Sequence, residues 1–282
     1  MAAKRSRSLT DDLLPAGSEV LLDIATDHGA LRIEQDPSRP SGRLVFLDGV
    51  ACSYIDLDDP GHLEFTYIRR FADIIAALWP SPEPLRVSHV GGGGVSFPRY
   101  LADTRPRSSQ IVYEYDGALI ELSRQHLGLV THPGLKIKIG DARPRMDRRT
   151  PDSADVVVGD AFVGRVVPPA LSSVEYVRQV RSVLGDSGIY LLNVIAGPDL
   201  HLARRHAATL RSEFPTVLVS SDPDVLSGKV SGNLVFLATG RRAKDLPLGA
   251  ILRACTSGSY PDRVIRPEEI AAFIAHAPVL TD

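Results

Sequence analysis

This sequence has few cysteines, little net charge and only short apolar runs, and each of these features excludes a class of protein. The 282 residues include two cysteines, Cys52 and Cys255, which cannot form a disulfide framework or supply the paired thiolates of a structural zinc site. A formal charge of −2, from 32 basic and 34 acidic residues, creates no overall positive field for nucleic acid or an anionic membrane. We therefore expect no nucleic-acid partner, no metal and a reducing, cytoplasmic setting.

Apolar stretches are also short. The most apolar ones, such as 189–195, fall far below the roughly 20 residues that span a bilayer. The first residues are basic, as in a signal peptide, but Asp11 and Asp12 stand where the apolar part of such a peptide would begin. We expect neither secretion nor a membrane partner. With 44% apolar and 23% charged residues, the chain is globular and can bury one large core or two unequal ones.

The order of turn, strand and helix patterns predicts four segments. Residues 1–17 are predicted to be a flexible tail. In 18–59, short runs of aliphatic and β-branched residues alternate with turn residues, which is typical of a small antiparallel β-domain. Residues 60–240 form the predicted catalytic domain, and 241–282 form a C-terminal extension of loops and one short helix opened by Pro267.

Within 60–240 the apolar period changes repeatedly between that of a helix and that of a strand. The first helix is predicted between His62 and Trp79. The strands that follow are predicted at 85–90, 111–115, 135–139, 154–159, 188–195, 216–220 and 233–238, with helices near 95–104, 117–127, 172–184 and 199–213. This alternation predicts an α/β fold with a mostly parallel sheet and helices on both faces.

Glycine or a carboxylate follows each of the first four predicted strands. In an open parallel sheet, ligands bind beyond the carboxyl ends of the strands. The first strand is followed by four glycines that lead into a helix, so a ligand can approach the backbone and the helix N-terminus. These glycines are Gly91, Gly92, Gly93 and Gly94. Glu114 follows the second strand, Asp141 and Ala142 follow the third, and Asp160 follows the fourth.

The pattern of these residues favours a nucleoside ligand. An acid about 20 residues beyond the glycines, here Glu114, can accept hydrogen bonds from both ribose hydroxyls. Positions 96 and 97 lack the third glycine of a dinucleotide fingerprint, and no Gly-Lys-Ser/Thr appears, so NAD and a polyphosphate are disfavoured. S-adenosylmethionine or a derivative remains, with the glycines at its amino-acid end and Asp141 and Ala142 at the adenine edge. Asp116 is better explained as a solvated loop acid or a helix cap.

Six motifs, taken in order, resemble the spermidine synthase family of polyamine aminopropyltransferases. They are L-D-G-V-A-C-S (47–53), L-E-F-T-Y (63–67), V-G-G-G-G (90–94), V-Y-E-Y-D (112–116), G-D-A (140–142) and D-V-V-V-G-D-A-F-V-G (155–164). The resemblance covers roughly residues 44–193. It implies a Rossmann-like, methyltransferase-type fold, decarboxylated S-adenosylmethionine as the donor, and methylthioadenosine plus an aminopropylated amine as products. It also implies a homodimer or a larger homo-oligomer.

The resemblance assigns roles to three further positions. Asp160 matches the carboxylate that helps to deprotonate the attacking amine, a step that is needed because an ammonium has no lone pair. Tyr67 matches the tyrosine that orients the acceptor, although a core aromatic on the helix face is an equal alternative. Cys52 stands in the cofactor-binding motif where the family usually has glutamine.

Three positions depart from the family pattern. The aspartate that holds the donor's ammonium is replaced by Gly94, a glutamate is replaced by Arg69, and a second acid after the fourth strand is replaced by Val163. A polyamine carries several positive charges, so its pocket should be lined with acids. Nearby acids that could substitute are Asp56, Asp58, Asp59 and Glu64, although a solvated loop and helix start is the favoured explanation of them.

Three hypotheses follow for the function. The first is a spermidine-synthase-like aminopropyltransferase that acts on a small-molecule amine. The second is an S-adenosylmethionine-dependent methyltransferase, because Gly94 removes the acid that favours the decarboxylated donor. The third is a non-catalytic nucleoside-binding homologue that has lost the acceptor pocket.

Overall fold

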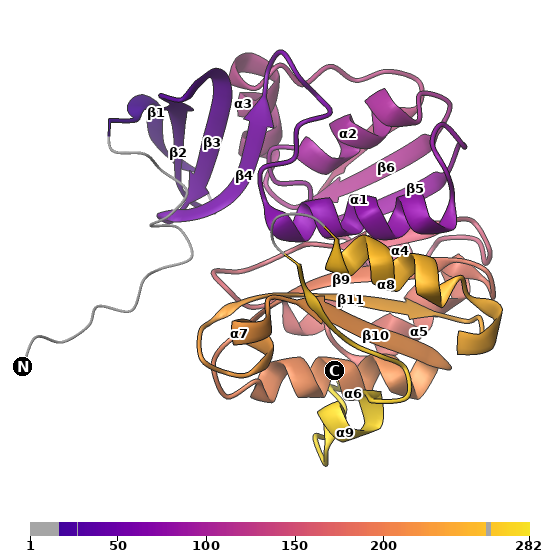
Figure 1. Cartoon of the computed structure of the whole chain (residues 1–282). Coiled ribbons are helices and arrows are strands. Elements are labelled where there is room, and N and C mark those ends of the chain that lie inside the picture. Colours follow the sequence, from indigo (N-terminus) through magenta and orange to yellow (C-terminus); the bar gives the residue numbers. More distant parts are fainter. Residues whose placement is uncertain (1–16, 27, 258–260) are drawn as a thin grey trace, which may run out of the picture.

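The computed structural model describes residues 17–26, 28–257 and 261–282, so almost all of the predicted tail, 1–17, lies outside the described residues. The chain begins with a four-stranded sheet in the order β1-β2-β3-β4, and every neighbouring pair is antiparallel (Figure 1). Its strands are β1 (Glu19–Thr26), β2 (Gly29–Asp36), β3 (Arg39–Leu47) and β4 (Val50–Asp56). The small antiparallel β-domain predicted ahead of the main sheet is therefore confirmed.

The second sheet has eight strands in the order β12-β10-β11-β9-β8-β5-β6-β7. Its strands are β5 (Arg86–Val90), β6 (Ser109–Glu114), β7 (Leu135–Ile139), β8 (Val156–Gly159), β9 (Ile189–Ala196), β10 (Thr216–Ser221), β11 (Gly232–Thr239) and β12 (Arg263–Ile265). The pairs from β9 through β8, β5 and β6 to β7 are parallel, whereas the pairs that join β9, β11, β10 and β12 are antiparallel. The central sheet is therefore mixed, and its parallel half contains the four strands that the predicted site residues follow.

Helices cover both faces of this sheet, as the alternation of patterns predicted. They are α1 (Thr66–Leu78), α2 (Ser96–Thr104), α3 (Gly117–His126), α4 (Arg143–Met146), α5 (Val174–Leu184), α6 (His201–Glu213), α7 (Pro223–Leu226), α8 (Leu248–Thr256) and α9 (Ile270–Ile274), with 3-10 turns at η1 (Pro169–Leu171) and η2 (Ala243–Asp245). Helices α1 and α8 lie on one face, and α5 and α6 lie on the other (Figure 1). In the described part of the chain, no helix combines the length and apolar character needed to cross a bilayer.

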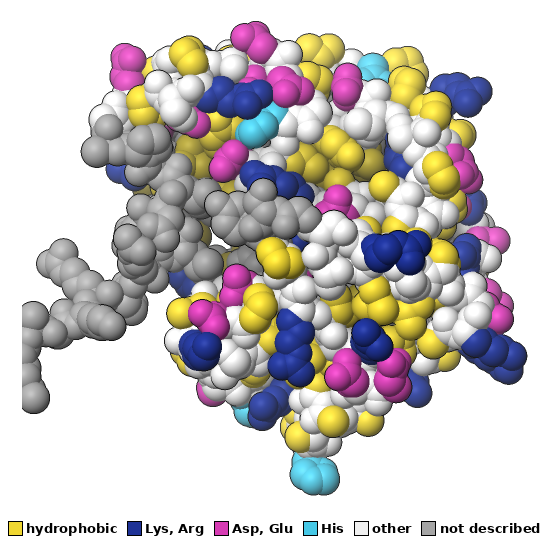
Figure 2. Space-filling view, in the orientation of Figure 1, with side chains coloured by type: hydrophobic (Ala, Val, Ile, Leu, Met, Phe, Trp, Pro, Cys, Tyr) yellow, Lys and Arg dark blue, Asp and Glu magenta, His cyan; other side chains and the backbone are white. Residues whose placement is uncertain are grey.

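Neighbouring strand residues fill two separate cores. Leu191 packs with α1 and α8, while Leu192 packs with α5 and α6, because successive side chains of a strand point to opposite faces. Burial on both faces explains the continuous apolar runs of these strands. Outside the cores, acidic and basic side chains are mixed over the face shown in Figure 2, which agrees with a formal net charge of −2.

Helix α3 connects the N-terminal sheet to the central one. Its Leu119, together with Leu127 just beyond it, packs against Leu31, Val45 and Ile55 of the N-terminal sheet. The helix begins at Asp116, whose carboxylate accepts hydrogen bonds from the backbone N–H groups of residues 118 and 119. The cap predicted for Asp116 is confirmed, and the packing of α3 holds the N-terminal sheet beside the carboxyl ends of the parallel strands.

The C-terminal region differs from the expectation of loops and one short helix. It contains α8, whose buried Ile251 packs in the core beside α1, and β12, which pairs with β10 at the edge of the central sheet. Only three residues form β12, too few for a periodic pattern. Helix α8, in contrast, has core-facing Leu248, Ile251, Leu252 and Cys255 at helical spacing, so the sequence carried a signal for it that was missed. The first helix also begins at Thr66 rather than at His62.

A buried ion pair joins α1 to this C-terminal region. Arg70 Nε donates a hydrogen bond to Asp262 Oδ2 at 2.8 Å, and the Asp262 carboxylate also accepts from Ser220 Oγ at 2.7 Å. Arg70 is 4% exposed, and its guanidinium donates a further hydrogen bond to the Ala254 carbonyl at 3.0 Å. Because a buried charge loses its hydration, removing one of these partners should destabilise the fold.

We expect Asp262→Ala to lower the free energy of unfolding by about 3 kcal/mol or more, because it removes a carboxylate partner of a buried guanidinium. Urea unfolding followed by circular dichroism measures the effect. Lys229→Ala is the matched control, because it breaks an exposed ion pair with Asp224 and should change stability by less than about 1 kcal/mol. Equal effects of the two substitutions would contradict the structural role of the buried pair.

Candidate active site

The glycine-rich loop after β5 lies against the loop after β8. Gly91 has a φ of +88°, and a Cβ atom at this position would lie 2.7 Å from the carbonyl carbon of Asp160. Only glycine permits both the backbone conformation and this close approach. The N–H of Asp160 in turn donates to the Val90 carbonyl at 2.8 Å, so the parallel pairing continues into the two loops.

Glu114, at the end of β6, is hydrogen-bonded directly to the glycine loop. Its Oε2 accepts from the N–H groups of Gly92 and Gly93 at 2.7 and 3.1 Å, and its Oε1 accepts from the Asp116 N–H at 3.0 Å. The side chain is 8% exposed. The structure thus brings together two of the predicted nucleoside-binding elements, and the carboxylate keeps free lone pairs for further donors such as ribose hydroxyls.

Asp141 and Ala142 lie at the same edge of the sheet. Ile139 is the register partner of Glu114, and the Gly140 N–H donates to the Glu114 carbonyl at 2.8 Å, so residues 141 and 142 follow directly beside the acid. Asp141 is exposed, and its Oδ1 accepts from the N–H of Arg143, the first residue of the short helix α4, at 2.9 Å. Ala142 is buried. One oxygen of Asp141 therefore binds the backbone ahead of α4, and no hydrogen bond from the described chain to the other oxygen is seen.

Asp160 is the centre of a second group of side chains. Tyr67, from α1, donates through its hydroxyl to Asp160 Oδ2 at 3.1 Å, and Asn193, from β9, donates through Nδ2 to Oδ1 at 2.9 Å. Tyr67 also packs its ring against Phe65 and Phe71. The tyrosine thus combines the two roles that its sequence left open, because its ring belongs to the aromatic core and its hydroxyl reaches the acid.

Burial makes Asp160 a stronger base than an ordinary aspartate. It raises the pKa of the carboxyl from 3.8 to about 6, while the hydrogen bonds from Asn193 and Tyr67 favour the ionised form and limit the rise. Burial, followed by the neighbouring Asp160 charge, raises the pKa of Tyr67 well above its usual value of 10. Near neutral pH, Asp160 is therefore ionised and able to accept a proton, and Tyr67 stays a hydrogen-bond donor.

Cys52, on β4, is near enough to both acids for their charges to act on it. Burial and then the charges of Glu114 and Asp160 raise the pKa of its thiol to about 12. A thiol that stays protonated is a poor nucleophile, so Cys52 can contribute shape and polarity to the site but no covalent chemistry. Within the described ranges, no three His, Cys, Asp or Glu side chains gather into a set that could hold a metal ion.

Two residues at the site were missed by sequence reasoning. Asn193 is 1% exposed, and its Oδ1 has no hydrogen-bond partner in the described chain although its Nδ2 is bound to Asp160. The available signal was a single amide inside the apolar run I-Y-L-L-N-V-I. Tyr115, directly after Glu114, is 63% exposed, and its ring centroid lies 4.8 Å from that of His28 at the β1–β2 turn.

The structure also shows what occupies the three divergent positions. A side chain at Gly94 would collide with Ile55 and would place its Cβ 2.9 Å from Ser53 Oγ, so β4 fills this space. The Arg69 guanidinium donates to the carbonyl groups of Leu63 and Glu64 and closes the turn ahead of α1. Val163 is 74% exposed on the loop after β8.

Three of the acids considered as substitutes, Asp56, Asp59 and Glu64, already contact an arginine or a histidine. Asp56 is 2% exposed and pairs with Arg39, which also reaches Asp59 at 3.1 Å. Glu64 lies 2.9 Å from His62 Nε2. These acids therefore stabilise the end of the N-terminal sheet and the start of α1.

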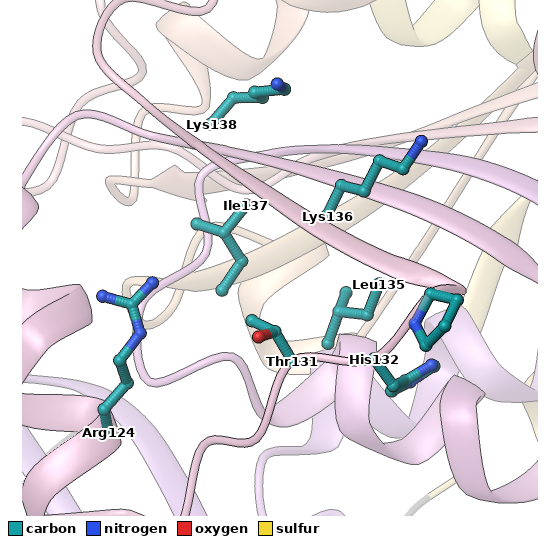
Figure 3. Close-up of a pocket in the computed structure, with 8 residues that line it drawn as sticks. Arg124, Thr131, His132, Leu135, Lys136, Ile137 and Lys138 are labelled. Atoms are coloured by element: carbon teal, nitrogen blue, oxygen red, sulfur yellow. The ribbon is translucent and has the colours of Figure 1, made fainter.

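A basic groove lies apart from these residues. It runs along the outer edge of β7 and is lined by the cationic or potentially cationic side chains of Arg124, His132, Lys136 and Lys138, together with Thr131 (Figure 3). None of the predicted site residues lines it. Lysines on an edge strand prevent edge-to-edge pairing of sheets, and this role accounts for Lys136 and Lys138.

Comparison with known proteins gives two groups of relatives, and no model of a protein family matches the chain. The polyamine aminopropyltransferase of Vibrio vulnificus is 28% identical over 189 residues, which are 66% of this chain and 60% of that protein. The eEF1A lysine and N-terminal methyltransferase of Homo sapiens is 29% identical over 163 residues, which are 51% of this chain and 23% of that protein.

A solved structure is similar over nearly the whole length. The crystal structure of a probable spermidine synthase from Corynebacterium glutamicum has a TM-score of 0.84 to this chain at 29% identity, covering 93% of this chain and 96% of the other. The likeness includes both sheets, and it agrees with the six sequence motifs. Together these relatives support the placement of the chain as a divergent member of the spermidine synthase family of polyamine aminopropyltransferases.

Proposed function

We propose that this protein is a transferase that binds a nucleoside of the S-adenosylmethionine type and passes an aminopropyl group from the decarboxylated form to a small amine. The observation that carries the proposal is the buried Asp160 carboxylate, which Tyr67 and Asn193 hold beside the glycine loop. Glu114, bonded to the same loop, is the expected ribose acceptor. The relation to polyamine aminopropyltransferases supports this assignment.

The reaction needs a base at the position of Asp160. An acceptor amine arrives as an ammonium, and Asp160 accepts one of its protons so that the nitrogen gains a lone pair. The buried Oδ1 of Asn193, which lacks a partner, can accept a second N–H and orient the nitrogen. The nitrogen then forms a bond to the carbon beside the sulfonium as the carbon–sulfur bond breaks. Methylthioadenosine leaves as a neutral thioether, and the proton on Asp160 passes to solvent.

Methyl transfer is the second candidate, and one observation favours it. The space beside Gly94 is filled by Ser53 and Ile55, so no acid there discriminates against a donor whose carboxylate is intact. The Ser53 and Ser96 hydroxyls lie 3.4 Å apart beside this glycine and can donate to a carboxylate. The similarity to a lysine methyltransferase is consistent with this alternative.

Nucleoside binding is the first expected outcome. Isothermal titration should detect binding of methylthioadenosine, and Glu114→Gln should weaken it about tenfold, because a neutral amide forms weaker hydrogen bonds to ribose hydroxyls than a carboxylate does. Glu121→Gln, on the exposed face of α3, is the matched control and should bind as the wild type does. Titration of decarboxylated and intact S-adenosylmethionine then separates the two candidates by preference. Absence of binding by all three nucleosides would refute both enzyme hypotheses.

Asp160→Asn should abolish turnover while it changes nucleoside affinity by no more than a few-fold. It should also raise the free energy of unfolding at pH 7.5, by up to about 3 kcal/mol, because folding moves the carboxyl pKa from 3.8 to about 6 and so disfavours the charged form. Product formation followed by mass spectrometry and urea unfolding provide the two readouts. Full activity of the variant would show that another group is the base.

The pH dependence of kcat should reflect the ionisation of the Asp160 carboxyl. We expect kcat to rise with pH through about 6 and then to level off, because the reaction needs the ionised form of Asp160. Asn193→Leu removes a hydrogen bond that lowers this pKa, so the rise should move to higher pH. A profile that keeps its midpoint in the variant would contradict the assignment of this titration to Asp160.

A further inference from the structure

We propose that the acceptor is a primary monoamine with an apolar body, rather than a diamine or a polyamine. The inference rests on the proposed function, because it takes Asp160 as the group that receives the amine. It concerns the number of positive charges that the described acceptor side of the site can neutralise. Each ammonium that leaves water needs an anionic or strongly accepting partner.

The described site offers one carboxylate to an ammonium. Asp160 and Glu114 are the acids whose charges act on Cys52. Glu114 is engaged by the N–H groups of Gly92, Gly93 and Asp116. Asp160 accepts from two neutral donors, Tyr67 and Asn193, so its charge is not neutralised by a cation in the described chain. One ammonium would therefore neutralise the charge of Asp160.

The loop that follows Asp160 carries apolar side chains and one cation, Arg165. Val163 and Val166 are joined by two backbone hydrogen bonds of 2.9 and 3.2 Å, and their side chains are 74% and 49% exposed. We call this pair the valine lip. Arg165, between them, is exposed at the turn. A second ammonium in this direction would meet methyl groups and a cation, whereas an alkyl or aryl body would pack against the valine lip.

Three of the four acids considered as substitutes are already engaged. Asp56 and Asp59 pair with Arg39, and Glu64 contacts His62 and lies 3.7 Å from Arg69. Recruiting these three carboxylates to a second ammonium would require existing contacts to break, and the fourth acid, Asp58, is exposed at the surface. Together these contacts favour an acceptor with one positive charge.

A matched pair of amines tests the inference. Pentylamine and 1,5-diaminopentane have the same chain length and differ by one terminal ammonium. With whichever donor is used, decarboxylated or intact S-adenosylmethionine, we expect kcat/KM for the monoamine to exceed that for the diamine at least tenfold. Mass spectrometry identifies the products. A diamine that reacts equally well or better would overturn the inference and leave the proposed function standing.

Binding of the same amines separates failure of the inference from failure of the proposed function. The two amines are titrated into protein saturated with methylthioadenosine, so no chemical step is required. Selective binding of pentylamine without product from either donor would overturn the proposed function and support the acceptor class. Binding of neither amine, or tighter binding of the diamine, would overturn the inference.

Val163→Asp tests the valine lip directly. An acid at this position should neutralise a second ammonium, so we expect the ratio of diamine to monoamine affinity to rise at least several-fold. Val130→Asp is the matched control, because Val130 is 75% exposed on the loop before β7, away from Asp160 in the sequence and outside the site described above. An unchanged ratio in Val163→Asp, or an equal change in Val130→Asp, would overturn the role of the valine lip.

Discussion

The close approach of two loops at Gly91 is the constraint on which the site depends. Because glycine has no side chain, the loop after β5 can lie against the Asp160 backbone, and both loops can follow directly from paired strands. This contact places the glycine amides and Glu114 beside the buried carboxylate of Asp160. Any larger residue at position 91 would separate the nucleoside half of the site from the acceptor half.

The N-terminal sheet determines how the site departs from the family pattern. Its strand β4 supplies Cys52, on which the charges of Glu114 and Asp160 act, and inserts Ser53 and Ile55 into the space beside Gly94. The loss of an acid at position 94 is therefore accompanied by packing that fills its place. On the acceptor side, Val163 is exposed and Arg69 donates to backbone carbonyl groups, so neither position supplies the negative charge of the family pattern.

The sequence predicted most of the elements that surround the site, and it failed where tertiary contacts carry the information. The strand predicted at 135–139 coincides with β7, and the helices near 95–104 and 117–127 correspond to α2 and α3, because each has an apolar period and a clear boundary. In contrast, β12 has three residues and exists because β10 offers it an edge. The antiparallel pairing of β9, β11 and β10 likewise depends on chain direction in space, which periodicity does not encode.

The low net charge and the scarcity of cysteine were properties of the sequence alone. So were the order of strands and helices and the glycines or acids that follow four successive strands. Those features determined the fold class and the family, because they depend on local spacing along the chain. The tertiary structure alone decided that Asn193 binds Asp160, that burial raises the pKa of this carboxyl to about 6, and that β4 occupies the space beside Gly94. These properties depend on groups that are distant in the sequence and meet only when the two sheets are assembled.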